Sequence, residues 1–194
     1  MVAPRREHLL KTALSLFNQY GFHATGIDKV QAVSGVSKTT MYKYFKSKDE
    51  LIQAVLEMRH DDFGQWFETR VGAIAKEKYP EHQHAKLLAV FDSLSEWFHS
   101  DTFFGCNFIN ASSEYSDINH PIHRYSSEHK IQLSQFIKKL LIEIPEADKQ
   151  ELSLEILVLI EGAIVCAHTT GLKDSAERAK GMMVRLLNSY LQSV

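Results

Sequence analysis

The first quarter of the chain alternates short amphipathic segments with turns. Apolar side chains recur at the spacing of one helical face at Leu10, Ala13, Leu14 and Phe17. This spacing predicts a helix over about residues 4–20, with Pro4 in its first turn and Gly21 at its end.

The next segment predicts a short helix between residues that favour helix ends. Thr25 and Asp28 have the spacing of a capping box, in which side chains bond the free backbone groups of a first turn. The expected buried side consists of Ile27, Val30 and Val33. Gly35 can then adopt the left-handed conformation that commonly follows the last turn of a helix.

A second short helix, predicted over Lys38–Tyr44, combines an apolar inner side with a polar outer side. Ser37 can cap it, and Met41 and Phe45 are expected to point inward. The expected exposed residues are Lys38, Thr39, Tyr42 and Lys43. Two short helices joined by a tight turn form a helix-turn-helix, whose second helix can lie in the major groove of DNA.

The rest of the chain shows helical rather than strand periodicity. Ser47 and Glu50 form another capping box, and the long helix after it is expected to end between Phe67 and Ile74. The polar run over residues 76–84 is the best candidate linker. Further helical patterns lie at about residues 84–99, 106–114, 120–142, 148–170 and 174–193. Because no segment shows β alternation bounded by hairpin turns, the predicted fold class is all-α.

Composition indicates a soluble protein with its own hydrophobic core. The 194 residues are 44% hydrophobic and 24% charged, which is ordinary for a globular domain. The longest apolar stretch, residues 156–167, is interrupted by Glu161 and is expected to be too short to span a bilayer. The N-terminus lacks a signal-peptide pattern. We therefore expect a cytoplasmic protein without a membrane partner.

Positive charge is concentrated near the N-terminus. Residues 1–50 contain eight Lys and Arg against four Asp and Glu, whereas the remaining residues contain fourteen against twenty. A basic segment on an acidic body fits a nucleic-acid-binding head, although the asymmetry alone is weak support.

Two motifs in the N-terminal segment carry a family resemblance. The run A-L-x-L-F-x-x-Y-G-F-x-A-T and the later run V-S-G-V-S-K-T-T-M-Y-K-Y-F-K-S-K-D-E-L resemble the N-terminal domain of the TetR family, over about residues 8–52. The resemblance implies a three-helix DNA-binding domain at residues 1–48 and a helical-bundle effector-binding and dimerisation domain at residues 49–194. It implies a homodimeric regulator, usually a repressor, that leaves a near-palindromic operator when a small-molecule inducer binds. No cofactor is expected.

The same resemblance assigns DNA contacts by motif position. Phosphate contacts fall on Thr25, Thr40, Tyr42, Tyr44 and Lys48, and base contacts on Ser37, Lys38, Thr39 and Lys43. Hydroxyl groups and ammonium groups suit both kinds of contact. A cation such as Lys48 in a first helical turn opposes the helix dipole unless an anion lies beyond it. A DNA phosphate could be that anion, and local neutralisation by Asp49 and Glu50 is an equally good explanation.

The last two predicted helices have more apolar residues than one buried face requires. These residues are Leu152, Ile156, Leu157, Leu159, Ile160, Ala163 and Ile164 in the first, and Met182, Met183, Leu186, Leu187 and Leu191 in the second. Burial within the chain is the default explanation. We favour a dimer interface built from both helices, because one reading head would contact only one half-site and the resemblance implies the same.

Aromatic residues accumulate in the middle of the chain, and most are expected to be core. A small-molecule sensor nevertheless needs an apolar pocket with a few polar groups. The candidate lining residues are Phe63, Trp66, Phe67, Trp97, Phe104, Cys106, Phe108, Asn110, Glu114, Glu161 and His168. Asn110 and Glu114 belong to a segment, F-F-G-C-N-F-I-N-A-S-S-E-Y, that resembles one found in a subset of the family. They lie one helical turn apart and either line the pocket or brace the helix.

Other reactive side chains have simpler explanations. Cys106 follows Gly105 near a helix start, so it is either a thiol that senses electrophiles or oxidants or, preferably, a buried inert thiol. Cys106 and Cys166 have no CxxC spacing, which argues against a disulfide or zinc framework. The pairs His82/His84 and His120/His123 lack a cysteine or carboxylate frame, and we expect surface histidines and no metal.

Two functional alternatives remain beside a ligand-responsive repressor. One is a DNA-binding protein of the same fold that acts through a protein partner without a small-molecule effector. The other is an enzyme. The sequence has no Ser-His-Asp arrangement, glycine-rich phosphate loop or metal-spaced cluster, so the chain is predicted not to be an enzyme.

Overall fold

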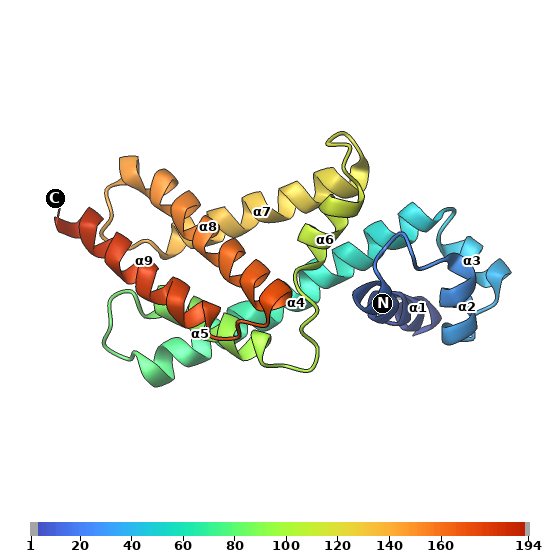
Figure 1. Cartoon of the computed structure of the whole chain (residues 1–194), viewed down its shortest axis with the longest axis horizontal. Coiled ribbons are helices and arrows are strands. Elements are labelled where there is room, and N and C mark those ends of the chain that lie inside the picture. Colours follow the sequence, from blue (N-terminus) through green and yellow to red (C-terminus); the bar gives the residue numbers. More distant parts are fainter. Residues whose placement is uncertain (1–3, 193–194) are drawn as a thin grey trace. The chain divides into compact units, whose positions relative to one another are not determined.

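The computed structural model describes residues 4–192, and the regular elements in this range are nine helices (Figure 1). They are α1 (Pro4–Tyr20), α2 (Ile27–Ser34), α3 (Lys38–Tyr44), α4 (Lys48–Lys78), α5 (Ala85–Phe98), α6 (Asn107–Glu114), α7 (Pro121–Leu140), α8 (Glu146–Thr170) and α9 (Ser175–Gln192). The predicted all-α fold class is confirmed, and each helix lies where helical periodicity placed one.

The chain forms two compact units. The head unit contains the chain up to Gly64 together with Asn107–His129, and the body unit contains Gln65–Cys106 together with the chain from Lys130. Helices α4 and α7 therefore each contribute residues to both units. These units are not the predicted functional domains of residues 1–48 and 49–194, so that division stays a prediction.

The turn between α2 and α3 has the expected caps. Gly35 has a φ of +67° and its N–H donates to the Gln31 carbonyl, which ends α2 in the left-handed conformation. Ser37 Oγ accepts the Thr40 N–H at 3.2 Å and thereby starts α3.

Two predictions about α2 are wrong. The residue at its N-cap is Gly26, which has no capping side chain, because the Thr25 hydroxyl donates to the carbonyls of Gly21 and Leu16 instead. Val33 is 59% exposed rather than buried. Val30 and Ser34, which lie one helical turn apart, form the buried face of α2. Val33 lies outside this face.

Helix α4 is longer than predicted. Ser47 Oγ accepts the Glu50 N–H at 3.1 Å, as in a capping box, while the Glu50 carboxylate accepts the Lys46 N–H at 2.7 Å. The helix continues to Lys78 and stops just before Pro80, because a residue that precedes proline is disfavoured in the helical conformation. The predicted linker over residues 76–84 therefore begins later, after Lys78.

In the body unit, α8 packs against α9 and both contact α5 (Figure 1). A polar cluster joins α5 to α9: the Lys180 ammonium donates to Asp92 at 2.9 Å, and the Tyr79 hydroxyl donates to the same carboxylate at 2.7 Å. Burial lowers the pKa of Lys180, but hydrogen bonds and attraction from Tyr79 and Asp92 outweigh it and raise that pKa overall.

Helix α8 is more apolar than the sequence pattern suggested. By length and composition it is the one helix in residues 4–192 that could cross a membrane, because Glu161 is offset by the apolar residues around it. The core helix of a water-soluble protein meets the same criterion. The side chains of Leu152, Ile156 and Ile160 are buried in the body unit, so much of this apolar surface already has a partner within the chain.

The four predicted surface histidines are not all at the surface. His84, at the start of α5, is 5% exposed, and both of its ring nitrogens are buried without a hydrogen-bond partner in the described structure. Burial, and next the nearby His82, lower the pKa of His84, while Glu143 opposes them. Within residues 4–192 no group of three or more His, Cys, Asp and Glu side chains could hold a metal.

Candidate nucleic-acid interface

Helix α3 presents a polar outer face and a buried inner face. Met41 is 1% exposed and Phe45, at its C-cap, is 4% exposed, so these two side chains anchor the helix to the core. The side chains of Lys38, Thr39, Tyr42 and Lys43 are exposed, as the sequence predicts, and Tyr44 is half-buried. The anchored inner face leaves ammonium and hydroxyl groups on one outer face of a short helix.

Two of the predicted base-contact residues also have structural partners. The Lys38 ammonium forms an exposed ion pair with Asp28 at 2.8 Å, and the hydrogen bond and attraction of Asp28 raise the pKa of Lys38. Exposed ion pairs contribute little stability, so Lys38 can exchange Asp28 for another partner at little cost. Ser37 and Thr40 share a hydroxyl–hydroxyl hydrogen bond of 2.9 Å at the start of α3. Their first role is to cap the helix.

Thr25 is a correction to the predicted phosphate contacts. Its side chain is fully buried and its hydroxyl donates to Gly21 at 2.7 Å, so it holds the α1–α2 turn and is not available to DNA. A hydroxyl that completes a buried turn cannot be inferred from motif position alone.

Lys48 has a role that neither sequence-based alternative anticipated. Its ammonium donates to the His23 carbonyl at 2.9 Å, which ties the first turn of α4 to the α1–α2 turn. Burial lowers the pKa of Lys48, and the carboxylates of Glu114 and Asp49 oppose that shift. An ammonium group has three donors, so this contact leaves donors for a phosphate.

Glu114 braces the head unit. The side chain, at the end of α6, accepts the backbone N–H of Phe22 at 2.8 Å and that of His23 at 2.5 Å. Of the two roles open for Glu114 in the sequence, lining a pocket or bracing the helix, the structure supports bracing, but of the α1–α2 turn rather than of α6 itself. Sequence spacing had no signal for this contact, because its partners are 91 and 92 residues away.

The predicted effector-contact residues are divided between the two units. Phe63, Phe108, Asn110 and Glu114 belong to the head unit, and Trp66, Phe67, Trp97, Phe104, Cys106, Glu161 and His168 belong to the body unit. In the body unit the Phe103 ring contacts Trp97 edge-on, with centroids 4.9 Å apart, and lies 6.3 Å from His168. A single pocket lined by all these side chains stays a prediction.

Cys106 lies in a charged cluster of the body unit. The thiol is 8% exposed, and the Lys130 ammonium lies 3.3 Å from its sulfur and 2.8 Å from the Glu161 carboxylate. Burial lowers the pKa of Lys130. Attraction from Cys106 and Glu161 and the hydrogen bonds to them outweigh this effect, so the net shift of the pKa is upward. The burial agrees with the preferred buried thiol, and Glu161 has an ion-pair partner within the chain.

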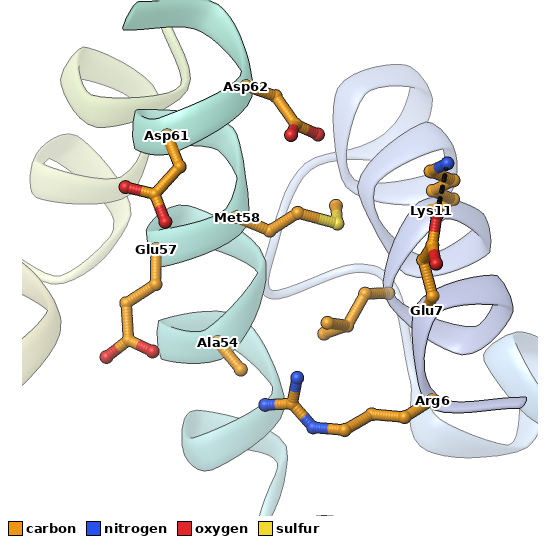
Figure 2. A pocket seen from close by; sticks show the side chains of 9 residues that line it. Arg6, Glu7, Lys11, Ala54, Glu57, Met58, Asp61 and Asp62 are labelled. Carbon is orange, nitrogen blue, oxygen red and sulfur yellow. Dashed lines mark hydrogen bonds and ion pairs between the residues drawn. The ribbon is translucent and has the colours of Figure 1, made fainter. Parts of the chain in front are cut away.

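A cleft of about 330 Å³ lies between α1 and α4 in the head unit (Figure 2). One wall carries Glu57, Asp61 and Asp62 from α4, and the other carries Arg6 and Lys11 from α1. Charged walls of both signs differ from the apolar pocket expected of the effector site, and none of the predicted effector residues lines this cleft.

Comparison with known proteins places the helix-turn-helix in a family. Residues 9–55 match the model for "Bacterial regulatory proteins, tetR family". The HTH-type transcriptional regulator RutR of Escherichia coli strain K12 is 42% identical over 55 residues, which are 28% of this chain and 26% of RutR. The matched segment thus spans about a quarter of that relative.

The likeness also extends through the body. The HTH-type transcriptional repressor ComR of Escherichia coli strain K12 is 28% identical over 189 residues, covering 93% of this chain and 88% of ComR. The structure of SCO4454, a TetR-family transcriptional regulator from Streptomyces coelicolor, matches with a TM-score of 0.83 and 28% identity over 98% of this chain and 91% of that chain. The helix-turn-helix of residues 9–55 thus belongs to the TetR family of bacterial regulatory proteins, and the whole chain shares the fold of a TetR-family transcriptional regulator.

Proposed function

We propose that this protein is a DNA-binding transcriptional repressor whose α3 helix reads the major groove. The observation that carries the proposal is the outer face of α3, where Thr39, Tyr42 and Lys43 are exposed beside a helix-turn-helix turn with intact caps. Membership of a family of regulators also agrees with the prediction that the chain is not an enzyme.

The division into base and phosphate contacts follows the motif positions of the TetR-family resemblance. Lys38, Thr39 and Lys43 are proposed for base edges, where ammonium groups suit guanine and hydroxyls suit several bases. The hydroxyls of Tyr42 and Tyr44 are proposed for phosphates, together with the remaining donors of Lys48. Ser37 is also proposed for a base edge and Thr40 for a phosphate, where the hydroxyl–hydroxyl bond between them leaves a lone pair or hydrogen available.

Homodimerisation through α8 and α9 is the second part of the proposal. Several apolar side chains on these helices remain exposed although the adjacent faces are buried, namely Leu154, Val158 and Val165 on α8 and Met182 on α9. An apolar surface of this kind is suited to a second copy of the chain. Two heads would then read the two halves of a near-palindromic operator.

Release by a small molecule is the third part. The body unit combines an aromatic cluster around Trp97 with the partly buried polar group of Cys106, Lys130 and Glu161, and pockets for small molecules use this mixture of apolar walls and few polar groups. ComR, which is named a transcriptional repressor, is related over nearly its full length, and this favours repression. The alternative, control by a protein partner, would need no such pocket.

Selection from a random duplex library tests the DNA-binding proposal. Purified protein is mixed with randomised duplex DNA, and the retained fragments are sequenced. We expect a motif with two inverted halves, bound with an affinity that falls steeply as salt rises. A protein that retains no motif and shows no salt-sensitive affinity for duplex DNA would overturn the proposal. The selected duplex also serves as the probe in the experiments below.

A further inference from the structure

The Glu114 carboxylate holds a turn rather than another side chain. Its two oxygens accept the N–H groups of two successive residues, Phe22 and His23, in the turn that joins α1 to α2. Hydrogen bonds to an ionised acceptor are shorter and about twice as strong as those between neutral groups. Because both donors belong to the backbone, the contact constrains the path of the main chain directly.

The turn is shaped to receive this carboxylate. Gly21 has a φ of +82°, a conformation that other residues rarely adopt, and a Cβ at this position would lie 3.0 Å from Glu114 Oε1. Thr25, at the other end of the turn, donates its hydroxyl to the Gly21 carbonyl. Glycine therefore provides both the backbone conformation and the space that the carboxylate occupies.

The chain next to Glu114 also holds the beginning of α4. The Tyr115 hydroxyl donates to Asp49 at 3.2 Å, and His120 Nε2 lies 3.5 Å from the same carboxylate. Burial and the neighbouring carboxylates, Asp49 foremost, raise the pKa of Tyr115, so its hydroxyl keeps the proton that it donates. Lys48 then connects α4 back to the His23 carbonyl.

These contacts lie on both sides of the helix-turn-helix along the chain. The α1–α2 turn precedes α2, and the start of α4 follows α3 by only a few residues. A recognition helix needs its supporting segments held to a fraction of an ångström, because side chains on a loose support miss the base edges. Both supports of α2 and α3 are thus bound to the end of α6.

We propose that Glu114 is a positioning residue for operator recognition, which clamps the α1–α2 turn so that α2 and α3 meet DNA in the correct register. This inference rests on the proposed function, since it assigns a role in DNA reading. Glu114 itself does not contact DNA in this proposal. Its effect passes through the backbone N–H groups of Phe22 and His23.

Glu114→Gln distinguishes the clamp, meaning the hydrogen bonds from Phe22 and His23 to Glu114, from a general effect of charge on DNA binding. The amide keeps one acceptor oxygen but turns an N–H₂ group toward a backbone donor, so one of the two hydrogen bonds is lost. Removing a negative charge from the head would by itself strengthen binding to the phosphate backbone. The clamp predicts the opposite sign. Glu128→Gln is the matched control, because it removes the same charge from an exposed residue of the head unit.

The measurement compares the two variants on the selected duplex. We expect Glu114→Gln to bind about 10-fold more weakly than Glu128→Gln, with helicity and dimerisation unchanged and a melting temperature lowered by only a few degrees, as the loss of one hydrogen bond to a charged group suggests. The amide protons of Phe22 and His23 should exchange with solvent at least about 10-fold faster. Binding of Glu114→Gln as tight as that of the control, unchanged amide exchange, or a general loss of helicity would overturn the proposal.

A second variant keeps the test decisive. Glu114→Asp keeps the charge but shortens the reach by one methylene, so electrostatics predicts no change and the clamp predicts weaker binding. If the wild-type protein retains no duplex at all, the proposed function fails, and the amide exchange of Phe22 and His23 still decides whether the clamp exists. If duplex binding is normal in both variants, the clamp fails and the proposed function stands.

Discussion

Side chains in and around α3 either hold the helix in place or project from it. Met41 fills the core and Ser37 caps the first turn, whereas Lys43 projects into solvent. Burial separates these roles more reliably than residue type. Thr25 illustrates this, because a hydroxyl expected at the DNA surface is fully buried and bonded within the fold. Substitutions on the exposed face should therefore change binding without changing stability.

Lys43→Ala should weaken binding to the selected duplex by about 1–3 kcal/mol and relax base preference at one position in each half-site. The physical reason is the loss of an ammonium group at a base edge. Fluorescence anisotropy with the selected and single-substituted duplexes measures both effects. Lys139→Ala, an exposed lysine of α7 in the body unit, is the control for loss of charge. Equal affinity of the two variants would remove Lys43 from the proposed interface.

The connection between α4 and α5 has a pH-sensitive residue inside it. His84 is 5% exposed, with neither ring nitrogen paired in the described structure, so the fold accommodates its neutral form. Burial and the nearby His82 lower its pKa in the folded protein, and Glu143 only partly opposes them. The unfolded chain binds the proton near the ordinary histidine pKa of about 6.5. Acid therefore favours unfolding.

The wild-type protein should lose stability as the pH falls from about 6.5 through the lowered pKa of His84, and His84→Leu should lose much less over that window. Above pH 6.5 the neutral form predominates in both states, so the contribution of His84 no longer changes with pH. Urea unfolding midpoints at fixed protein concentration, taken from pH 7.5 to 5, measure the difference. His99→Gln, an exposed histidine after α5, is the control. Parallel pH profiles of the wild type and His84→Leu would contradict the explanation.

Apolar surface that the chain does not cover itself lies on α8 and α9. Val158 is 69% exposed and Met182 is 49% exposed, although the neighbouring Ile156 and Met183 are buried. Helix α8 thus contacts its own core on one side and exposes an apolar side, on which the proposed second copy of the chain would pack. A symmetric pair of reading heads would follow from that contact.

Val158→Lys should convert the proposed dimer to a monomer at micromolar concentration, because it would place a charge in the proposed apolar contact. Sedimentation measures the mass, and anisotropy should show weaker binding to the selected duplex because only one half-site is occupied. Ile131→Lys makes the same change at a 54% exposed residue of α7, outside the proposed interface. A dimeric Val158→Lys protein, or a monomeric Ile131→Lys protein, would place the interface elsewhere.

Local order is the part of this protein that can be obtained from the amino-acid pattern. Helix positions, the Gly35 end of α2 and the Ser37 cap depend on residues a few positions apart, and helical periodicity and capping preferences describe those distances well. Contacts between distant segments required the folded chain. The Glu114 clamp joins residues more than ninety positions apart, and the burial of Thr25 and His84 depends on what packs around them. The spacing of nearby residues predicts neither the long-range contact nor the burial, because both arise only when the helices assemble.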